Sequence, residues 1–165
     1  HRCFEMYLQE TGLPYRCKRV AGSSVFWELP PATVETIRQS ASLPMPRDAY
    51  RVGWTMRRAP GALVAGSSGT AVVEYRNEGP CTWMHPVHVG IVWSPLAPGG
   101  SPRSDSDRAL PNRRVGPGET VSLEVAVRAP SIPGRYRLEF DLVHEGVAWF
   151  SHQGAPTLAV DLDVT

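Results

Sequence analysis

Short segments in which apolar and polar residues alternate fill the chain from residue 50 onward. A period of two places the apolar side chains of a strand on one face, which must then pack against a second layer. Turn residues separate the segments, as in Asn77-Glu78-Gly79-Pro80. The apolar residues of the six clearest segments are Tyr50, Val52, Trp54 and Met56; Ala71, Val73 and Tyr75; Val87, Val89, Ile91 and Trp93; Val121, Leu123, Val125 and Val127; Tyr136, Leu138, Phe140 and Leu142; and Leu158, Val160, Leu162 and Val164.

Turn-forming residues are abundant, with 15 Gly and 16 Pro among 165 residues, which favours many short strands over long helices. Roughly seven to nine strands fit into about 115 residues, the spacing of an immunoglobulin-like sandwich. We therefore predict an all-β chain with an antiparallel immunoglobulin-like β-sandwich over residues 50–165. We expect Tyr136 to return its hydroxyl to the upstream backbone as a tyrosine corner, and Leu96–Pro111 to form a long exposed loop.

The first 49 residues have a different pattern. Apolar residues at i, i+3 and i+4 predict a short amphipathic helix over Arg2–Glu10, and Tyr15–Val20 and Ser24–Leu29 predict a hairpin. We therefore expect a helix and hairpin segment over residues 1–30. A linker that can hold one helical turn follows over residues 31–49.

Charge and cysteine content exclude several classes of protein. With 17 Lys and Arg against 16 Asp and Glu, the chain lacks the basic excess of a nucleic-acid-binding protein. No apolar run approaches the ~18 residues of a membrane span. The cysteines Cys3, Cys17 and Cys81 have no CxxC spacing, which argues against a structural zinc site and favours a cytoplasmic location. A Cys3–Cys17 disulfide is conceivable in an oxidising compartment.

The sequence contains no pattern typical of a catalytic or metal site. There is no G-x-S-x-G elbow, and His85 and His88 straddle the start of a strand, so that their rings should point in different directions. Asp141 and Glu145 could in principle serve as paired carboxylates in glycoside hydrolysis. Acidic residues that alternate outward along a strand are, however, typical of a solvated face. We therefore predict no catalytic residues, no metal and no cofactor.

The tryptophans are the remaining candidates for a binding site. Trp54 and Trp93 share faces with apolar residues and are expected in the core. Trp83 and Trp149 lie at turns, where an exposed ring can stack on a sugar. Alternatively, each of the two caps an end of the core. The candidate ligand-binding residues, taken with the neighbouring histidines, are Trp83, His85, His88, Trp149 and His152.

Several short motifs between Trp54 and Val164 carry a family resemblance. They are Ala65-Gly66, Val73–Asn77 with Glu78-Gly79, Thr82-Trp83, Val115–Glu119, Ala129-Pro130, Pro133–Leu138 and Leu142–Phe150. With these motifs, about two thirds of the chain resembles immunoglobulin-like accessory modules of bacterial proteins and, distantly, the four-tryptophan domain of autophagy receptors. The last motif is similar to modules at the C-terminal ends of glycosyltransferases, methyltransferases and other enzymes of surface-polysaccharide assembly. Because the later tryptophans are spaced differently from the four-tryptophan pattern, its peptide-docking role is not carried over.

A second resemblance covers roughly the first 30 residues. A helix, then Gly12, then a hairpin that ends with Ser24–Leu29 resembles the last helix and hairpin of a class I S-adenosylmethionine-dependent methyltransferase. The chain has no strand followed by a Gly-rich cofactor loop, so the resemblance implies a tail without the catalytic apparatus. The alternative is that the helix and hairpin simply pack on the sandwich.

Two functions from different classes follow. The first is a non-catalytic C-terminal accessory module of a bacterial glycan-modifying or methyltransferase enzyme, which binds a polysaccharide while tethered to that enzyme. The alternative is a structural or protein-interaction module that docks on a partner or on the parent enzyme, by a sheet edge or by the Leu96–Pro111 loop.

Overall fold

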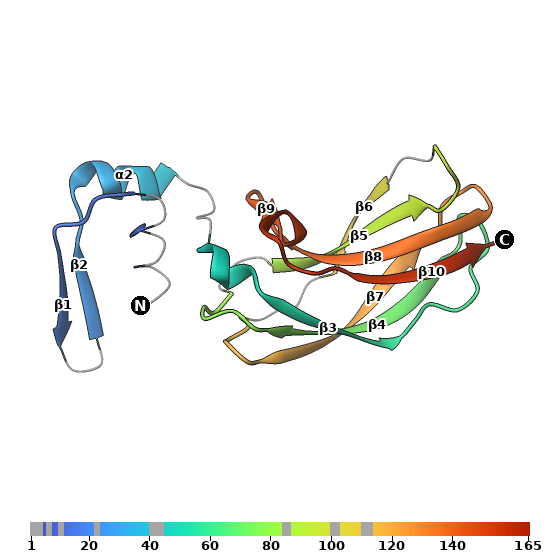
Figure 1. The fold of residues 1–165 in the computed structure, drawn as a ribbon, viewed down its shortest axis with the longest axis horizontal. Coiled ribbons are helices and arrows are strands. Elements are labelled where there is room, and N and C mark those ends of the chain that lie inside the picture. The colour runs from blue at the N-terminus through green and yellow to red at the C-terminus, as the bar shows by residue number, and fades with distance from the viewer. Residues whose placement is uncertain are drawn as a thin grey trace.

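A computed structural model describes residues 5, 8, 9, 12–21, 24–39, 45–83, 87–99, 103–109 and 114–165 of the chain. Two parts are visible in Figure 1: a hairpin with a helix near the N-terminus, and a larger β-sandwich that ends at the C-terminus.

The first part contains the predicted hairpin. Strands β1 (Cys17–Ala21) and β2 (Ser24–Glu28) pair antiparallel, with Cys17 opposite Glu28. Of the predicted helix over Arg2–Glu10, the described residues Glu5, Leu8 and Gln9 are helical. The antiparallel pairing of β1 with β2 confirms the predicted hairpin.

Helix α2 (Pro31–Gln39) follows the hairpin and is longer than the single turn expected in this region. Pro31 occupies the first helical position, where its missing N–H removes no intrahelical hydrogen bond. The buried Thr33 donates its hydroxyl to the carbonyl of Pro14 at 2.9 Å, which ties the helix to the residues before the hairpin. The domain boundaries at residues 30 and 49 stay predictions from the sequence.

The second part is an antiparallel sandwich of two sheets (Figure 1). One sheet has the strand order β10-β8-β5-β6, with β9 also paired to β8, and the other has the order β3-β4-β7. The elements of this part are η1 (Arg47–Tyr50), β3 (Val52–Arg58), β4 (Ser68–Asn77), β5 (Val87–Pro95), β6 (Arg103–Ala109), β7 (Thr120–Arg128), β8 (Gly134–His144), β9 (Ala148–Trp149), η2 (Ser151–Gln153) and β10 (Leu158–Val164).

The predicted alternation matches the observed core. Along β7, Val121, Val125 and Val127 are buried, while Ser122 and Glu124 are exposed. The apolar residues of β4, β5 and β8 are buried in the same way between the two sheets. Tyr50 is buried but is the last residue of the short helix η1, just before the strand in which it was expected, which begins at Val52. The all-β sandwich is therefore confirmed.

The prediction of a long loop over Leu96–Pro111 is wrong, because this stretch contains strand β6. β6 ends the strand order of its sheet and pairs antiparallel with β5, with Ala109 opposite Val89. Its sequence, RSDSDRA, has no apolar alternation. A strand at a sheet edge is held by backbone hydrogen bonds and can carry polar side chains, so its hydropathy does not reveal it.

The expected tyrosine corner is present at the start of β8. Tyr136 is buried, and its hydroxyl donates to the carbonyl of Ile132 at 2.9 Å. This bond fixes the chain that enters β8 against the strand itself, as in other Greek-key sandwiches.

Cys81 is disulfide-bonded and buried in the connection between β4 and β5. The Cys3–Cys17 pair considered from the sequence involves Cys3 and the side chain of Cys17, which lie outside the described part of the chain.

Candidate functional site

The outer surface of the sheet β10-β8-β5-β6 brings together two of the candidate binding residues, His88 and Trp149. Trp149 lies on β9 opposite Val143, and the next residue, Phe150, is fully buried in the core. Since successive side chains of a strand point to opposite faces, Trp149 is left on the outer surface. It is half-buried there.

Gly90 on β5 makes room for the ring of Trp149. A Cβ atom at this position would lie 2.7 Å from Cζ3 of Trp149 and 2.8 Å from a methyl carbon of Val143. Such separations are far below van der Waals contact, so any larger residue would push the indole away. The indole therefore reaches from β9 across β8 to β5.

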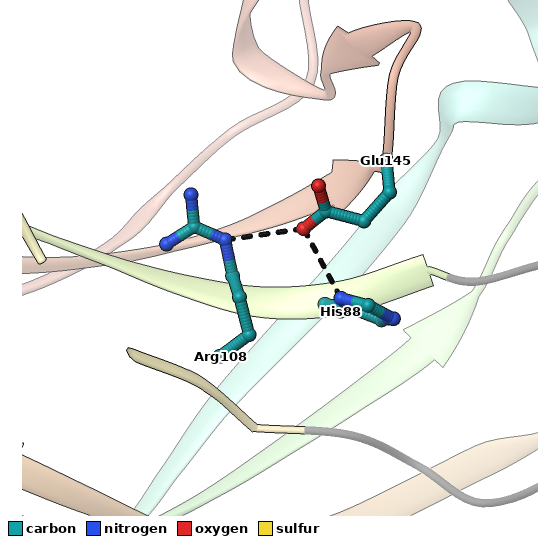
Figure 2. Close-up of polar contacts among 3 residues, drawn as sticks. All are labelled: His88, Arg108 and Glu145. Carbon is teal, nitrogen blue, oxygen red and sulfur yellow. Dashed lines mark hydrogen bonds and ion pairs between the residues drawn. The ribbon is translucent and has the colours of Figure 1, made fainter. Parts of the chain in front are cut away.

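His88, Arg108 and Glu145 form a polar network, and Figure 2 shows their side chains pointing toward one another. Oε1 of Glu145 accepts from Nδ1 of His88 at 3.1 Å and from Nε of Arg108 at 3.2 Å. The side chains of His88, Arg108 and Glu145 are 15%, 24% and 37% exposed. The guanidinium carbon of Arg108 also lies 5.1 Å from the centre of the Trp149 ring, within cation–π range. We call His88, Arg108, Glu145 and Trp149 the outer-face cluster.

The three polar residues come from three different elements. His88 lies on β5, Arg108 on β6, and Glu145 directly follows β8. Each contact in the network joins two of these elements, so the side chains are positioned by the sheet and by one another. The arrangement combines an aromatic surface with a cation, a carboxylate and an imidazole, which can together hold a ligand that has both C–H and hydroxyl groups.

Asp141 lies on β8 beneath this region and is only 2% exposed. Its Oδ2 accepts from the backbone N–H of Ser151 at 3.2 Å. Burial raises the pKa of Asp141, and the hydrogen bonds from Ser151 and the nearby charge of His152 only partly offset this rise. Among the described residues, Oδ1 of Asp141 has no hydrogen-bond partner.

The expectation that Asp141 belongs to a solvated face is therefore wrong. The chain around η2 covers this position on β8, so period-two alternation does not report the burial of Asp141. Because a polysaccharide cannot reach this carboxylate, the pair Asp141 and Glu145 has no geometry for glycoside hydrolysis.

Trp83 does not present a ring to solvent, contrary to its proposed role as a sugar platform. It is 2% exposed, and its Nε1 donates to the carbonyl of Ala49 at 2.7 Å. Its ring packs edge to face on Phe150, with centroids 5.2 Å apart. Trp83 therefore caps one end of the core, which was the alternative. Trp93 is also buried and Trp54 partly buried, as expected.

The remaining candidates lie in different places. His152 is exposed on η2, and His85 lies outside the described residues. Sequence reasoning missed Arg108 as a site residue, because it lies in the strand that was expected to be a loop. Glu145 was considered only as a hydrolytic carboxylate, and no sequence signal links it to His88, which is 57 residues away.

The part of the chain that the structure describes contains no group of three or more His, Cys, Asp or Glu side chains that could hold a metal ion. Among the same residues, no helix is long and apolar enough to cross a membrane.

The solved structures to which this chain is similar differ widely from it in sequence. A β-glucosidase from Listeria innocua in complex with glucose has 10% identity and a TM-score of 0.45, and the alignment covers 69% of this chain and 16% of that one. The alkylpurine DNA glycosylase AlkC of Pseudomonas fluorescens has 10% identity and a TM-score of 0.47, with 69% and 30% covered. A PapD-like domain of human CEP192 has 13% identity and a TM-score of 0.36, with 89% and 96% covered.

The chain thus spans 16% and 30% of the length of the first two of these proteins. Comparison with curated protein sequences gave no match. A family model, in contrast, matches residues 61–164, which is more than half of the chain and nearly all of the sandwich. The chain therefore belongs to the family of the Ig-like domain from next to BRCA1 gene.

Proposed function

We propose that the sandwich is a non-catalytic binding module that takes carbohydrate at the outer-face cluster. The observation that carries this proposal is the indole of Trp149, half-buried beside three polar side chains that are already joined to one another. Sugars offer C–H groups that contact an aromatic ring and hydroxyls that both donate and accept hydrogen bonds. Carboxylate, guanidinium and imidazole groups complement those hydroxyls.

The ion pairs of the cluster support binding in a second way. Because Glu145 already holds His88 and Arg108 in place, these side chains lose little conformational freedom when a ligand arrives. The guanidinium of Arg108 lies over the indole, so a sugar would contact the ring beside Arg108 or displace it.

The experiment measures the affinity of the protein for a panel of polysaccharides by titration calorimetry. For any glycan that binds, Glu145→Gln is expected to weaken binding at least about ten-fold, because hydrogen bonds to a charged group contribute about 1.5–3 kcal/mol. The matched control is Glu74→Gln, since Glu74 pairs with Arg57 at 2.8 Å on the other sheet. Unchanged affinity in Glu145→Gln would show that the cluster is not the site.

The variant Gly90→Ala tests whether the indole of Trp149 contributes to binding, without removing that side chain. The added Cβ displaces the indole of Trp149, and we expect glycan binding to fall while the protein stays folded. Gly61→Ala is its control, because a Cβ at Gly61 meets no atom within 4 Å. Equal affinity in the two variants would exclude a role for Trp149.

The wider context of the module also belongs to this proposal. We infer that it is the C-terminal accessory module of a bacterial glycan-modifying or methyltransferase enzyme, to which it is tethered. The resemblance of the helix and hairpin to a methyltransferase tail supports this inference. The test is S-adenosylmethionine binding by the full-length natural protein, where the absence of both binding and glycan-modifying activity would contradict the inference.

The cellular location stays a prediction. A cytoplasmic protein was expected, but the disulfide at Cys81 favours an oxidising compartment, because thiols are kept reduced in the cytosol.

A docking role is the second candidate, favoured by the position of β6. This strand ends the order of its sheet, and an edge strand can pair with an extended segment of a partner or of the parent enzyme. Pull-down with the parent enzyme distinguishes the two roles. Docking through β6 would be supported by a partner whose binding is abolished by a proline in β6 and is unchanged by Glu145→Gln.

A further inference from the structure

A hollow of about 260 Å³ lies at the end of the sandwich where η1 and η2 approach each other. It is separate from the outer-face cluster and shares no residue with it. Its lining residues are Arg47, Tyr50, Arg51, Val52, Glu78, Gln153, Gly154, Ala155 and Pro156. Figure 1 shows η1 and the short helix that follows β9 near each other at this end.

The hollow combines an apolar floor with charged walls. Tyr50 and Val52 are 3% and 2% exposed and belong to the core. Arg47 and Arg51 lie on the exposed surface of η1 and directly after it. Gln153, exposed on η2, adds an amide that can donate and accept hydrogen bonds.

The charge of the lining selects the ligand. The lining contains two guanidinium groups, those of Arg47 and Arg51, and one carboxylate, that of Glu78, so these side chains sum to one net positive charge. Asp48, the acidic residue of η1, is not among the lining residues. A single net positive charge suits a monoanion better than a phosphate dianion, and the planar guanidinium matches a carboxylate.

The walls of the hollow are built into the fold. Gly53 lacks a side chain, and a Cβ there would lie 2.5 Å from Oε1 of Glu78, so the glycine leaves space for that carboxylate. On the opposite wall, Nε1 of Trp54 donates to the carbonyl of Pro156 at 3.0 Å. The backbone N–H of Ala155 donates to the carbonyl of Phe150 at 3.1 Å. These contacts fix the segment from Gln153 to Pro156 before any ligand binds.

We propose that this hollow binds the carboxylate-bearing ring of an acidic sugar, a hexuronic acid. Its volume lies below the range of about 300–1,000 Å³ that drug-sized ligands occupy, which suits one ring rather than an oligosaccharide. The carboxylate contacts Arg47 and Arg51, and the carbon skeleton lies over Tyr50 and Val52. This inference deepens the proposed carbohydrate binding but places it at a second, independent site.

The test uses D-glucuronate and D-glucose, which differ at the carboxylate, and follows binding by NMR titration of the whole chain. We expect glucuronate to shift the resonances of residues around the hollow, with a much weaker effect of glucose. Arg51→Gln is expected to weaken glucuronate binding at least about ten-fold, the usual effect of losing a hydrogen bond to a charged group.

Two controls separate this site from the outer-face cluster. Arg128→Gln removes an exposed arginine on β7 and should leave glucuronate binding unchanged. Glu145→Gln should also leave it unchanged, so a failure of the outer-face cluster and a failure of the hollow are distinguishable. Equal binding of glucose and glucuronate, or equal affinity in Arg51→Gln and Arg128→Gln, would overturn the proposal.

Discussion

Asp141 is a residue whose surroundings could not be read from its position on a strand. It stands between Phe140 and Leu142, both buried in the core, and its side chain points to the other surface of the sheet. There the segment around Ser151 covers it and donates a backbone N–H to it. Burial dominates, so the pKa of the folded carboxyl is raised above its ordinary value of 3.8.

The raised pKa of Asp141 predicts a pH dependence of stability with a definite sign. The folded state holds the proton more tightly than the unfolded state, so the contribution of Asp141 is fully present below the unfolded pKa. That contribution is lost as the pH rises through the raised, folded pKa. We expect Asp141→Asn, which cannot ionise, to lack this loss and to gain stability relative to the wild type as the pH rises.

Urea denaturation between about pH 3 and 7 measures this difference in the free energy of unfolding. Asp161→Asn is the comparison with the opposite sign, because the hydrogen bond from Arg137 lowers the pKa of Asp161. The free energy of unfolding of the wild type should therefore increase relative to that of Asp161→Asn as the pH rises. A difference between the wild type and Asp141→Asn that does not change with pH would contradict the prediction.

At the scale of elements, the connection after β4 depends on one side chain, Asn77. It is fully buried, and its Nδ2 donates to the carbonyls of Cys81 at 2.7 Å and Val115 at 2.9 Å. Its Oδ1 accepts from the backbone N–H of Gly79 at 2.9 Å. The carbonyl of Asn77 also accepts from the N–H of Gly118, a glycine with a φ of 76°. Asn77 thus joins two turns that lie 38 residues apart.

We expect Asn77→Ala to lower the free energy of unfolding by at least about 2 kcal/mol, because buried N–H and carbonyl groups lose their partner. Chemical denaturation measures the change. Ser122→Ala, at an exposed position on β7, is the control and should change stability by less than about 0.5 kcal/mol. A loss in Asn77→Ala no larger than in this control would show that the turns are held by other contacts.

For the whole molecule, the disulfide at Cys81 decides how the two parts are joined. Both other cysteines of the chain, Cys3 and Cys17, precede residue 31. We therefore expect the disulfide of Cys81, if its partner is in this chain, to link the segment before α2 to the connection between β4 and β5. This disulfide would be a second covalent connection between the two parts, in addition to the chain between α2 and η1.

Reduction should lower the stability of the wild-type protein by about 2–4 kcal/mol, because the cross-link restricts the unfolded chain. Denaturation with and without reductant measures this effect. Cys81→Ser should be insensitive to reductant, and one of Cys3→Ser and Cys17→Ser should behave like it, which identifies the partner. Three free thiols in the unreduced protein, counted by mass spectrometry after alkylation, would refute the prediction.

The alternation of apolar and polar residues is enough to predict the sandwich and most of its core. The alternation along β7 is sufficient, because a strand with Val121, Val125 and Val127 on one face must bury that face against another layer. The same local logic identified the turn at Asn77 and the corner at Tyr136. It also left Trp149 and His88 as binding candidates, and these two residues lie in one cluster.

The remaining features depend on contacts between segments that are not adjacent in the chain. β6 is a strand because β5 offers it backbone hydrogen bonds, although its own residues have no strand-like pattern. Trp83 is buried under a segment 34 residues away, Asp141 is covered by the chain that returns over it ten residues later, and Arg108 meets Glu145 across 37 residues. Periodicity reports which face of a strand a residue occupies. Whether that face meets solvent, a charge or another segment depends on non-local contacts, which no local pattern encodes.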